Sequence, residues 1–144
     1  MKTKDFLHQL DHKKVVAAIQ KAELKTSGEI RVFVSRKHIE APVPVAQQHF
    51  LRMGMTRTRE RNAVLIFVAP LSHKFAVVGD VGVHKRCGEE FWLKLAEEMT
   101  DHFKRSEFTT GLVQGIRKAG DLLAEYFPRR PDDRNELPDE IEHD

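Results

Sequence analysis

The 144-residue sequence contains one cysteine, one tryptophan and one tyrosine. Because Cys87 has no second cysteine to pair with, an intramolecular disulfide is excluded. Sparse cysteine is typical of a reducing compartment, and we expect a cytoplasmic protein. No window approaches the roughly 20 apolar residues that a membrane-spanning helix needs. The first residues, MKTKDFLHQLDHKK, carry charges throughout and lack the apolar centre of a signal peptide.

Several sequence motifs that carry known chemistry are also missing. There is no Walker sequence and no nucleophile elbow, and the segment 79–82 (GDVG) lacks the third glycine of a dinucleotide-binding loop. A basic cluster at Arg52, Arg57, Arg59 and Arg61 has no aromatic residues between its members on which bases would stack. We therefore predict no nucleic-acid partner.

Charge is unevenly distributed along the chain, although the net charge is only +2. Residues 129–144 contain three basic and seven acidic side chains, which leaves a net charge of +6 on residues 1–128. This division predicts a single domain over 1–128 followed by an acidic, disordered tail over 129–144. A basic body attracts anionic partners, but the same surface is equally explained as ordinary solvated charge.

Three segments have the pattern of β-strands. The unbroken apolar run Ala63–Ala69 predicts a strand that is covered on both faces. Residues 29–35 alternate in polarity and predict a second strand, and residues 75–78 predict a third. Because the break at 70–73 is short, the last two of these strands in chain order should form an antiparallel hairpin.

Helical periodicity occupies most of the remaining chain. Apolar residues recur near every 3.6 positions in 3–25, 45–56, 89–104 and 107–127, whereas two prolines predict a loop at 36–44. A helix between the first two strands requires those strands to be parallel. We predict an α/β fold, a three-layer α/β/α sandwich in which helices flank a small mixed sheet on both faces.

This topology brings polar residues to one edge of the sheet. The amino ends of the two parallel strands should lie beside the carboxyl end of the antiparallel third strand. A helix that begins near Cys87 should also direct its free N–H groups towards this edge, where they would hold an anion. The candidate site residues are Glu29, Glu60, Arg61, Asn62, Asp80, His84 and Lys85.

Several of these residues have two interpretations. Asp80 and Glu29 are candidate ligands for a divalent cation, which prefers carboxylate oxygens. Asp80 is equally explained as a turn residue that bonds its own backbone, and Glu29 as an ion-pair partner of Arg31 or Arg61. His84 is either a ligand and proton carrier or a surface residue.

Two further groups lie outside this edge. Asp5, His8 and His12 have a helical spacing that suits Zn²⁺, although exposed histidines are more often solvated. Cys87 near basic residues, at the start of the helix predicted there, has the surroundings of a low-pKa thiol. No second residue completes a recognisable set of nucleophile and base around it.

Four segments in order resemble the TPM domain family. They are residues 27–32 (SGEIRV), 61–70 (RNAVLIFVAP), 78–83 (VGDVGV) and 103–115 (FKRSEFTTGLVQG), and the resemblance extends over residues 10–127. It implies an α/β/α sandwich, binding of a divalent cation that is usually calcium, and an acid phosphatase activity. Where the family motif K-D-N-G has its aspartate, this sequence has Arg61.

Three functions are therefore considered. The first is a soluble binding or accessory module that holds a protein partner or a small anion at the polar edge. The second is a phosphatase that depends on Ca²⁺, Mg²⁺ or Mn²⁺, in which Asp80 and Glu29 hold the metal and Arg61 or Lys85 steadies the phosphate. The third is an accessory factor that is recruited to a membrane-protein complex.

Overall fold

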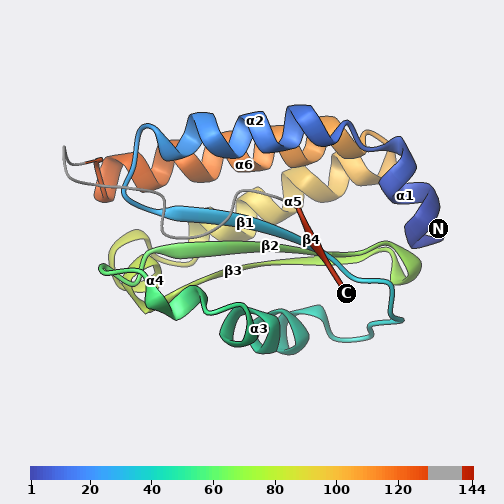
Figure 1. Ribbon diagram of the computed structural model, residues 1–144, viewed down its shortest axis with the longest axis horizontal. Coiled ribbons are helices and arrows are strands. Elements are labelled where there is room, and N and C mark those ends of the chain that lie inside the picture. The colour runs from blue at the N-terminus through green and yellow to red at the C-terminus, as the bar shows by residue number, and fades with distance from the viewer. Residues whose placement is uncertain (130–140) are drawn as a thin grey trace.

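The computed structural model describes residues 1–129 and 141–144. These residues form an α/β fold with one mixed four-stranded sheet and six α-helices (Figure 1). The elements in chain order are α1 (Thr3–Gln9), α2 (His12–Glu23), β1 (Glu29–Val34), α3 (Pro42–Arg52), β2 (Ala63–Ala69), β3 (Lys74–Gly79), α4 (Val81–Cys87), α5 (Glu90–Lys104), α6 (Phe108–Tyr126) and β4 (Glu142–His143). Short 3₁₀ turns lie at Met55–Arg57 and Pro70–Ser72.

The sheet has the strand order β3-β2-β1-β4. β1 and β2 run parallel, with Glu29 opposite Ala63, and β2 and β3 run antiparallel, with Leu65 opposite Val78. The predicted parallel pair and hairpin are thereby confirmed. Every residue of β1 and β2 is buried, whereas β3 at the edge of the sheet includes partly exposed positions.

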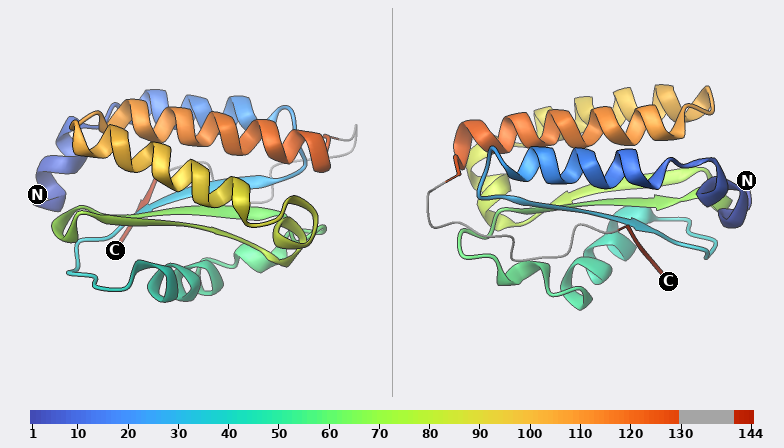
Figure 2. Two further views of the ribbon diagram at one scale, coloured as in Figure 1. Left: turned by 180° about the vertical axis from the view of Figure 1, so that it is seen from behind. Right: turned by 45° about the horizontal axis from the view of Figure 1, so that its top comes forward.

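Alternate strand residues enter two separate cores. Ile30 and Val32 of β1 pack with residues of α1, α2, α5 and α6, and these helices lie together on one side of the sheet (Figures 1 and 2). Phe33 and Phe67 pack on the other face with Ala46 and other residues around α3. Because both faces are covered, β2 is apolar at every position, and each large side chain buried there contributes about 1.5–3 kcal/mol.

The helix expected over residues 3–25 is two helices. Leu10 leaves helical geometry, with φ −77° and ψ 135°, and Asp11 then caps α2 by accepting a hydrogen bond from Lys14 N at 3.2 Å. Aspartate is a favoured residue at this capping position. The break places His8 and His12 on different helices, so the helical spacing proposed for a zinc site is wrong.

Two other helix starts differ from the prediction. α3 begins at Pro42 rather than at residue 45, because proline is tolerated in a first helical turn, where its missing N–H has no partner to lose. α4 begins at Val81, inside the loop expected over 79–82. Its short length and Gly82 weaken the sequence signal for a helix.

The last described residues, 141–144, return to the sheet. β4 pairs in parallel with β1, and Val34 lies opposite His143. The sequence predicts no strand here. Residues 130–140 of the expected acidic tail lie outside the described residues, so their disorder stays a prediction.

Side chains hold this segment against β1. Asp144 accepts hydrogen bonds from Ser35 Oγ at 2.6 Å and from Arg36 N at 2.7 Å. Glu142 accepts a hydrogen bond from Arg31, whose side chain is 6% exposed. The segment therefore supplies partners to polar groups near the carboxyl end of β1.

Candidate functional site

Separate chain segments meet at the amino ends of the parallel strands. Gly82 N donates a hydrogen bond to Arg61 O at 2.9 Å, which ties the start of α4 to the residues before β2. A Cβ atom at Gly28 would lie 3.1 Å from Asn62 O, so the approach to β1 packs on the same residues. The fold thus brings the predicted segments together at one edge.

Arg61 and Asp80 form a two-point ion pair at this edge. Arg61 Nε donates to Asp80 Oδ2 at 2.6 Å, and Arg61 Nη2 donates to Asp80 Oδ1 at 2.8 Å. The Asp80 side chain is 4% exposed, whereas the Arg61 side chain is 44% exposed. The hydrogen bond with Asp80 raises the pKa of Arg61, so the guanidinium stays charged.

The Asp80 carboxylate also caps a helix. Its Oδ1 atom also accepts a hydrogen bond from Val81 N at 2.7 Å, and Asp80 is the N-cap residue of α4. Both carboxylate oxygens therefore serve the helix start or Arg61. This geometry agrees with the interpretation of Asp80 as a residue that bonds its neighbouring backbone.

The close approach of α4 depends on glycine. A Cβ atom at Gly82 would lie 2.4 Å from Glu60 O and 2.6 Å from Arg61 O, which are both backbone atoms. Arg61 itself has φ 53°, a conformation that is uncommon for residues with a side chain. The turn before β2 is thus shaped to meet the first turn of α4.

A second group of hydrogen-bonded polar side chains includes the two residues that flank Arg61 in the sequence. Ser27 Oγ donates to Glu60 Oε2 at 2.5 Å and accepts a hydrogen bond from Asn62 Nδ2 at 3.0 Å. Asn62 is 1% exposed, and within the described residues its Oδ1 atom has no hydrogen-bond partner. Ser27 is absent from the predicted site because the pair Ser27–Gly28 signals a helix end. Its place just before β1 would have put it at this edge.

The remaining candidates occupy different surroundings. Glu29 is 3% exposed at the first position of β1. His84 and Lys85 are exposed on α4, one turn beyond Asp80. The predicted site residues therefore comprise a partly buried ion pair, a Ser27-centred polar group, a buried glutamate and two exposed basic side chains.

The alternative sites have less support. Within residues 1–129 and 141–144, no three His, Cys, Asp or Glu side chains are grouped so that they would hold a metal ion. Cys87 is the last residue of α4, not the first residue of a helix. Burial, followed by the charge of Glu125, raises the pKa of this thiol, so the low-pKa prediction is wrong.

Comparison with known proteins places this geometry in a family. The TPM domain matches residues 1–122. The chain belongs to the TPM domain family. Among solved structures, the NMR structure of BA42 protein from the psychrophilic bacterium Bizionia argentinensis sp. nov. matches with a TM-score of 0.86 and 38% identity, covering 92% of each chain. A search of curated proteins gave no match.

In this TPM domain, the residues at the edge do not fit a resident divalent cation. The two Asp80 oxygens lie 2.6 and 2.8 Å from guanidinium nitrogens of Arg61. A cation that approached Asp80 would meet the positive charge of Arg61 at short range, which is unfavourable. The geometry around Asp80 therefore supports no reaction step that passes through a metal ion.

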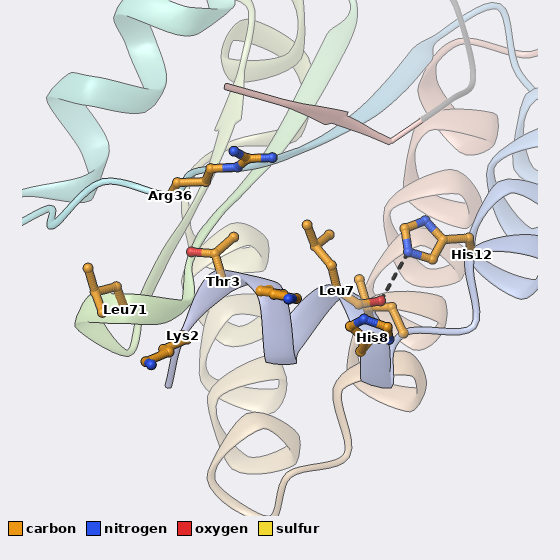
Figure 3. A pocket seen from close by; sticks show the side chains of 9 residues that line it. Lys2, Thr3, Leu7, His8, His12, Arg36 and Leu71 are labelled. Carbon is orange, nitrogen blue, oxygen red and sulfur yellow. Dashed lines mark hydrogen bonds between the residues drawn. The ribbon is translucent and has the colours of Figure 1, made fainter.

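The TPM domain also has two cavities at the opposite end of the sheet, where the parallel strands finish. One has a volume of about 780 Å³ and lies beside α1, with Thr3, Leu7, Arg36 and Leu71 in its lining (Figure 3). The other, of about 360 Å³, includes Val68 of β2. Among residues 1–129 and 141–144, none of the helices combines the length and the apolar content that a transmembrane segment requires.

Proposed function

We propose that this TPM domain is a binding module that recognises an anionic partner, such as an acidic protein segment, at the edge formed by Arg61, Asp80, His84 and Lys85. The observation that carries this proposal is which member of the Arg61–Asp80 ion pair faces solvent. The anion of the pair is buried and the cation is 44% exposed, so the pair presents positive charge to solvent.

Neighbouring side chains add to this positive surface. Lys85 is exposed on α4, and Arg57 and Arg59 are exposed in the segment before β2. Single exposed ion pairs contribute only about 0–1 kcal/mol, but a cluster of like charge accelerates encounter with an anionic partner. Helices on both faces of the sheet, a three-layer α/β/α sandwich, would hold this surface rigid.

The proposal is tested by titrating a glutamate-rich peptide into ¹⁵N-labelled protein at low and at high salt. We expect amide shifts centred on residues 60–62 and 81–86 that weaken as salt rises. Lys85→Glu should weaken binding, whereas Lys94→Glu, which alters an exposed lysine on α5, should leave it unchanged.

Other outcomes decide against the proposal or narrow it. Shifts that are absent, or that Lys85→Glu and Lys94→Glu reduce equally, would remove this edge as a specific surface. Inorganic phosphate forms the second arm of the experiment. Binding of phosphate without binding of the peptide would assign the edge to a small anion.

The family resemblance supports a second proposal, a metal-dependent acid phosphatase. The hydrogen bonds between Arg61 and Asp80 oppose this proposal, because the Asp80 carboxylate would have to release the Arg61 guanidinium before it could bind a metal ion. Hydrolysis of a phosphoester that requires Ca²⁺, Mg²⁺ or Mn²⁺ and disappears in Asp80→Asn would establish it. Recruitment to a membrane-protein complex and a cytoplasmic location stay predictions.

A further inference from the structure

The smaller cavity at the carboxyl end of β2 has aromatic walls. Its lining includes Phe6 of α1, Phe75 of β3, Phe103 of α5 and Phe108 of α6. The ring centroids of Phe6 and Phe108 are 4.9 Å apart, and those of Phe75 and Phe103 are 5.2 Å apart. Its volume of about 360 Å³ falls within the range of roughly 300–1,000 Å³ that small-molecule sites occupy.

The walls of this cavity are held in place by the surrounding fold. Val68 at the end of β2 is 3% exposed and belongs to the main core, and Pro70 is buried. A Cβ atom at Gly111 would lie 2.9 Å from the Phe103 ring, so this ring packs directly on the backbone of α6. The cavity is therefore formed before any ligand enters, which lowers the entropy cost of binding.

The polar residues of the lining are basic or neutral. They are His73, Lys74, Lys104 and Ser106, all exposed, and no acidic side chain lines the cavity within the described residues. Lys74 Nζ donates to Glu40 O at 2.6 Å, in the segment before α3, so its ammonium lies on the other face of the sheet from Phe75 and leaves Lys104 as the lysine that serves the cavity. The cavity thus combines an apolar interior with a cationic rim.

We propose that this cavity binds a medium-chain fatty acid, whose hydrocarbon body lies between the phenylalanine rings and whose carboxylate faces Lys104. Charge complementarity selects an anionic head group, and the aromatic walls select an apolar body. The site lies at the opposite end of the sheet from the proposed protein-binding edge and is independent of it. Ligand sites in α/β sheets favour this carboxyl end.

The larger cavity does not support an equivalent proposal. Lys2, Lys4, His8, His12 and Arg36 contribute positive or titratable groups to its lining. Figure 3 shows that the charged ends of Lys2 and Arg36 lie well apart, and that His12 is turned towards the backbone of Leu7, with which it shares a hydrogen bond. Lys2, His12 and Arg36 therefore do not converge on one anion.

The first test is a titration of ¹⁵N-labelled full-length protein with decanoate, octanoate and hexanoate, followed by amide shifts and calorimetry. We expect the largest shifts at Val68, Phe75, Phe103 and Phe108. Each added methylene should tighten binding about fourfold until the cavity is filled, since burial of one methylene contributes about 0.8 kcal/mol. Decanol and decylamine serve as neutral and cationic probes and should bind more weakly than decanoate.

A matched pair of variants tests the head-group contact. Lys104→Gln and Lys94→Gln each remove one exposed charge from α5, but only Lys104 lines the cavity. Lys104→Gln should weaken decanoate binding about two- to fivefold without affecting decanol, and Lys94→Gln should change neither.

Three results would overturn the proposal. The first is decanoate, at its highest monomeric concentration, shifting no amide of the cavity or shifting chiefly amides elsewhere. The second is equal binding of decanoate, decanol and decylamine. The third is an equal loss of decanoate affinity in Lys104→Gln and in Lys94→Gln. None of these results would bear on the glutamate-rich peptide at the other end of the sheet.

Discussion

The two ends of the sheet arrange charged residues in opposite ways. At the amino end of the parallel strands, Asp80 is buried beneath Arg61, and Ser27 links Glu60 to Asn62. At the carboxyl end, an aromatic cavity has Lys104 on its rim and no acid among the described lining residues. Polar and charged residues of the kinds found in catalytic and metal sites are concentrated at the amino end, but there they form hydrogen bonds with one another. Space for a small ligand is built where apolar side chains from several elements meet.

The largest expected effect compares two helical glycines, one at each end. Gly82→Ala would place Cβ 2.4 Å from Glu60 O, a backbone atom, and we expect a loss of about 2–3 kcal/mol in unfolding free energy. Gly111→Ala would place Cβ 2.9 Å from the Phe103 ring, which is a side chain and not a backbone atom. Because alanine favours a helix by about 1 kcal/mol, that change should stay within about 1 kcal/mol of the natural protein. Urea denaturation measures both, and equal losses would contradict the difference between the two ends.

A smaller effect separates the two roles of Asp80. Asp80→Ala removes the N-cap of α4 together with the partner of Arg61, and we expect a loss of about 1–2 kcal/mol in unfolding free energy. Asp80→Asn keeps a capping oxygen and removes the charge, so it should cost less than half as much. Thermal and chemical denaturation compare the two variants. A loss in Asp80→Asn as large as in Asp80→Ala would show that the ion pair, not the cap, supports this edge.

The smallest effect is a pH dependence at the carboxyl end of β1. Burial opposes the charge of Asp144, but hydrogen bonds from Ser35 and Arg36 outweigh it and hold the pKa of Asp144 below its usual value. A lowered carboxyl pKa gives stability that is complete above about pH 4 and is lost as the pH falls through the lowered value.

We therefore expect the amide signals of Ser35, Arg36 and His143 to move together in acid as β4 loosens. Asp144→Asn should abolish that transition and leave the signals near Arg61 unchanged. A transition that persists in Asp144→Asn would assign the pH dependence to another group.

Much of the fold follows from local patterns in the sequence. The run Ala63–Ala69 has no polar residue to turn outward, so a strand covered on both faces is the arrangement that suits it. Periodicity does not reveal the break at Leu10, because Leu10 continues the apolar pattern across the two helices and is buried like its neighbours in that pattern. β4 has only two residues, too few for any pattern, and depends on pairing with a strand far away in the sequence.

The candidate site also has features that the sequence predicts and features that it does not. Topology alone predicts that the segments holding Arg61 and Asp80 meet at one edge. It does not predict that they pair, because the pairing accompanies a φ of 53° at Arg61 and the helix that Asp80 caps. The aromatic cavity is assembled from α1, β3, α5 and α6, and residues so widely spaced leave no local pattern.

The central claim is that Arg61 occupies the carboxylate of Asp80, which would otherwise be a candidate ligand for a divalent cation. The most direct test is a thermal-melt series on chelator-treated protein with Ca²⁺, Mg²⁺ or Mn²⁺, using the natural chain, Arg61→Asp and Asp80→Asn. A ligand that binds only the folded state at a hundred times its Kd adds about 2.7 kcal/mol of stability. We predict no cation-dependent rise in Tm for the natural chain and a clear rise for Arg61→Asp, which places a second carboxylate near Asp80. A rise in the natural chain that Asp80→Asn abolishes would contradict the account.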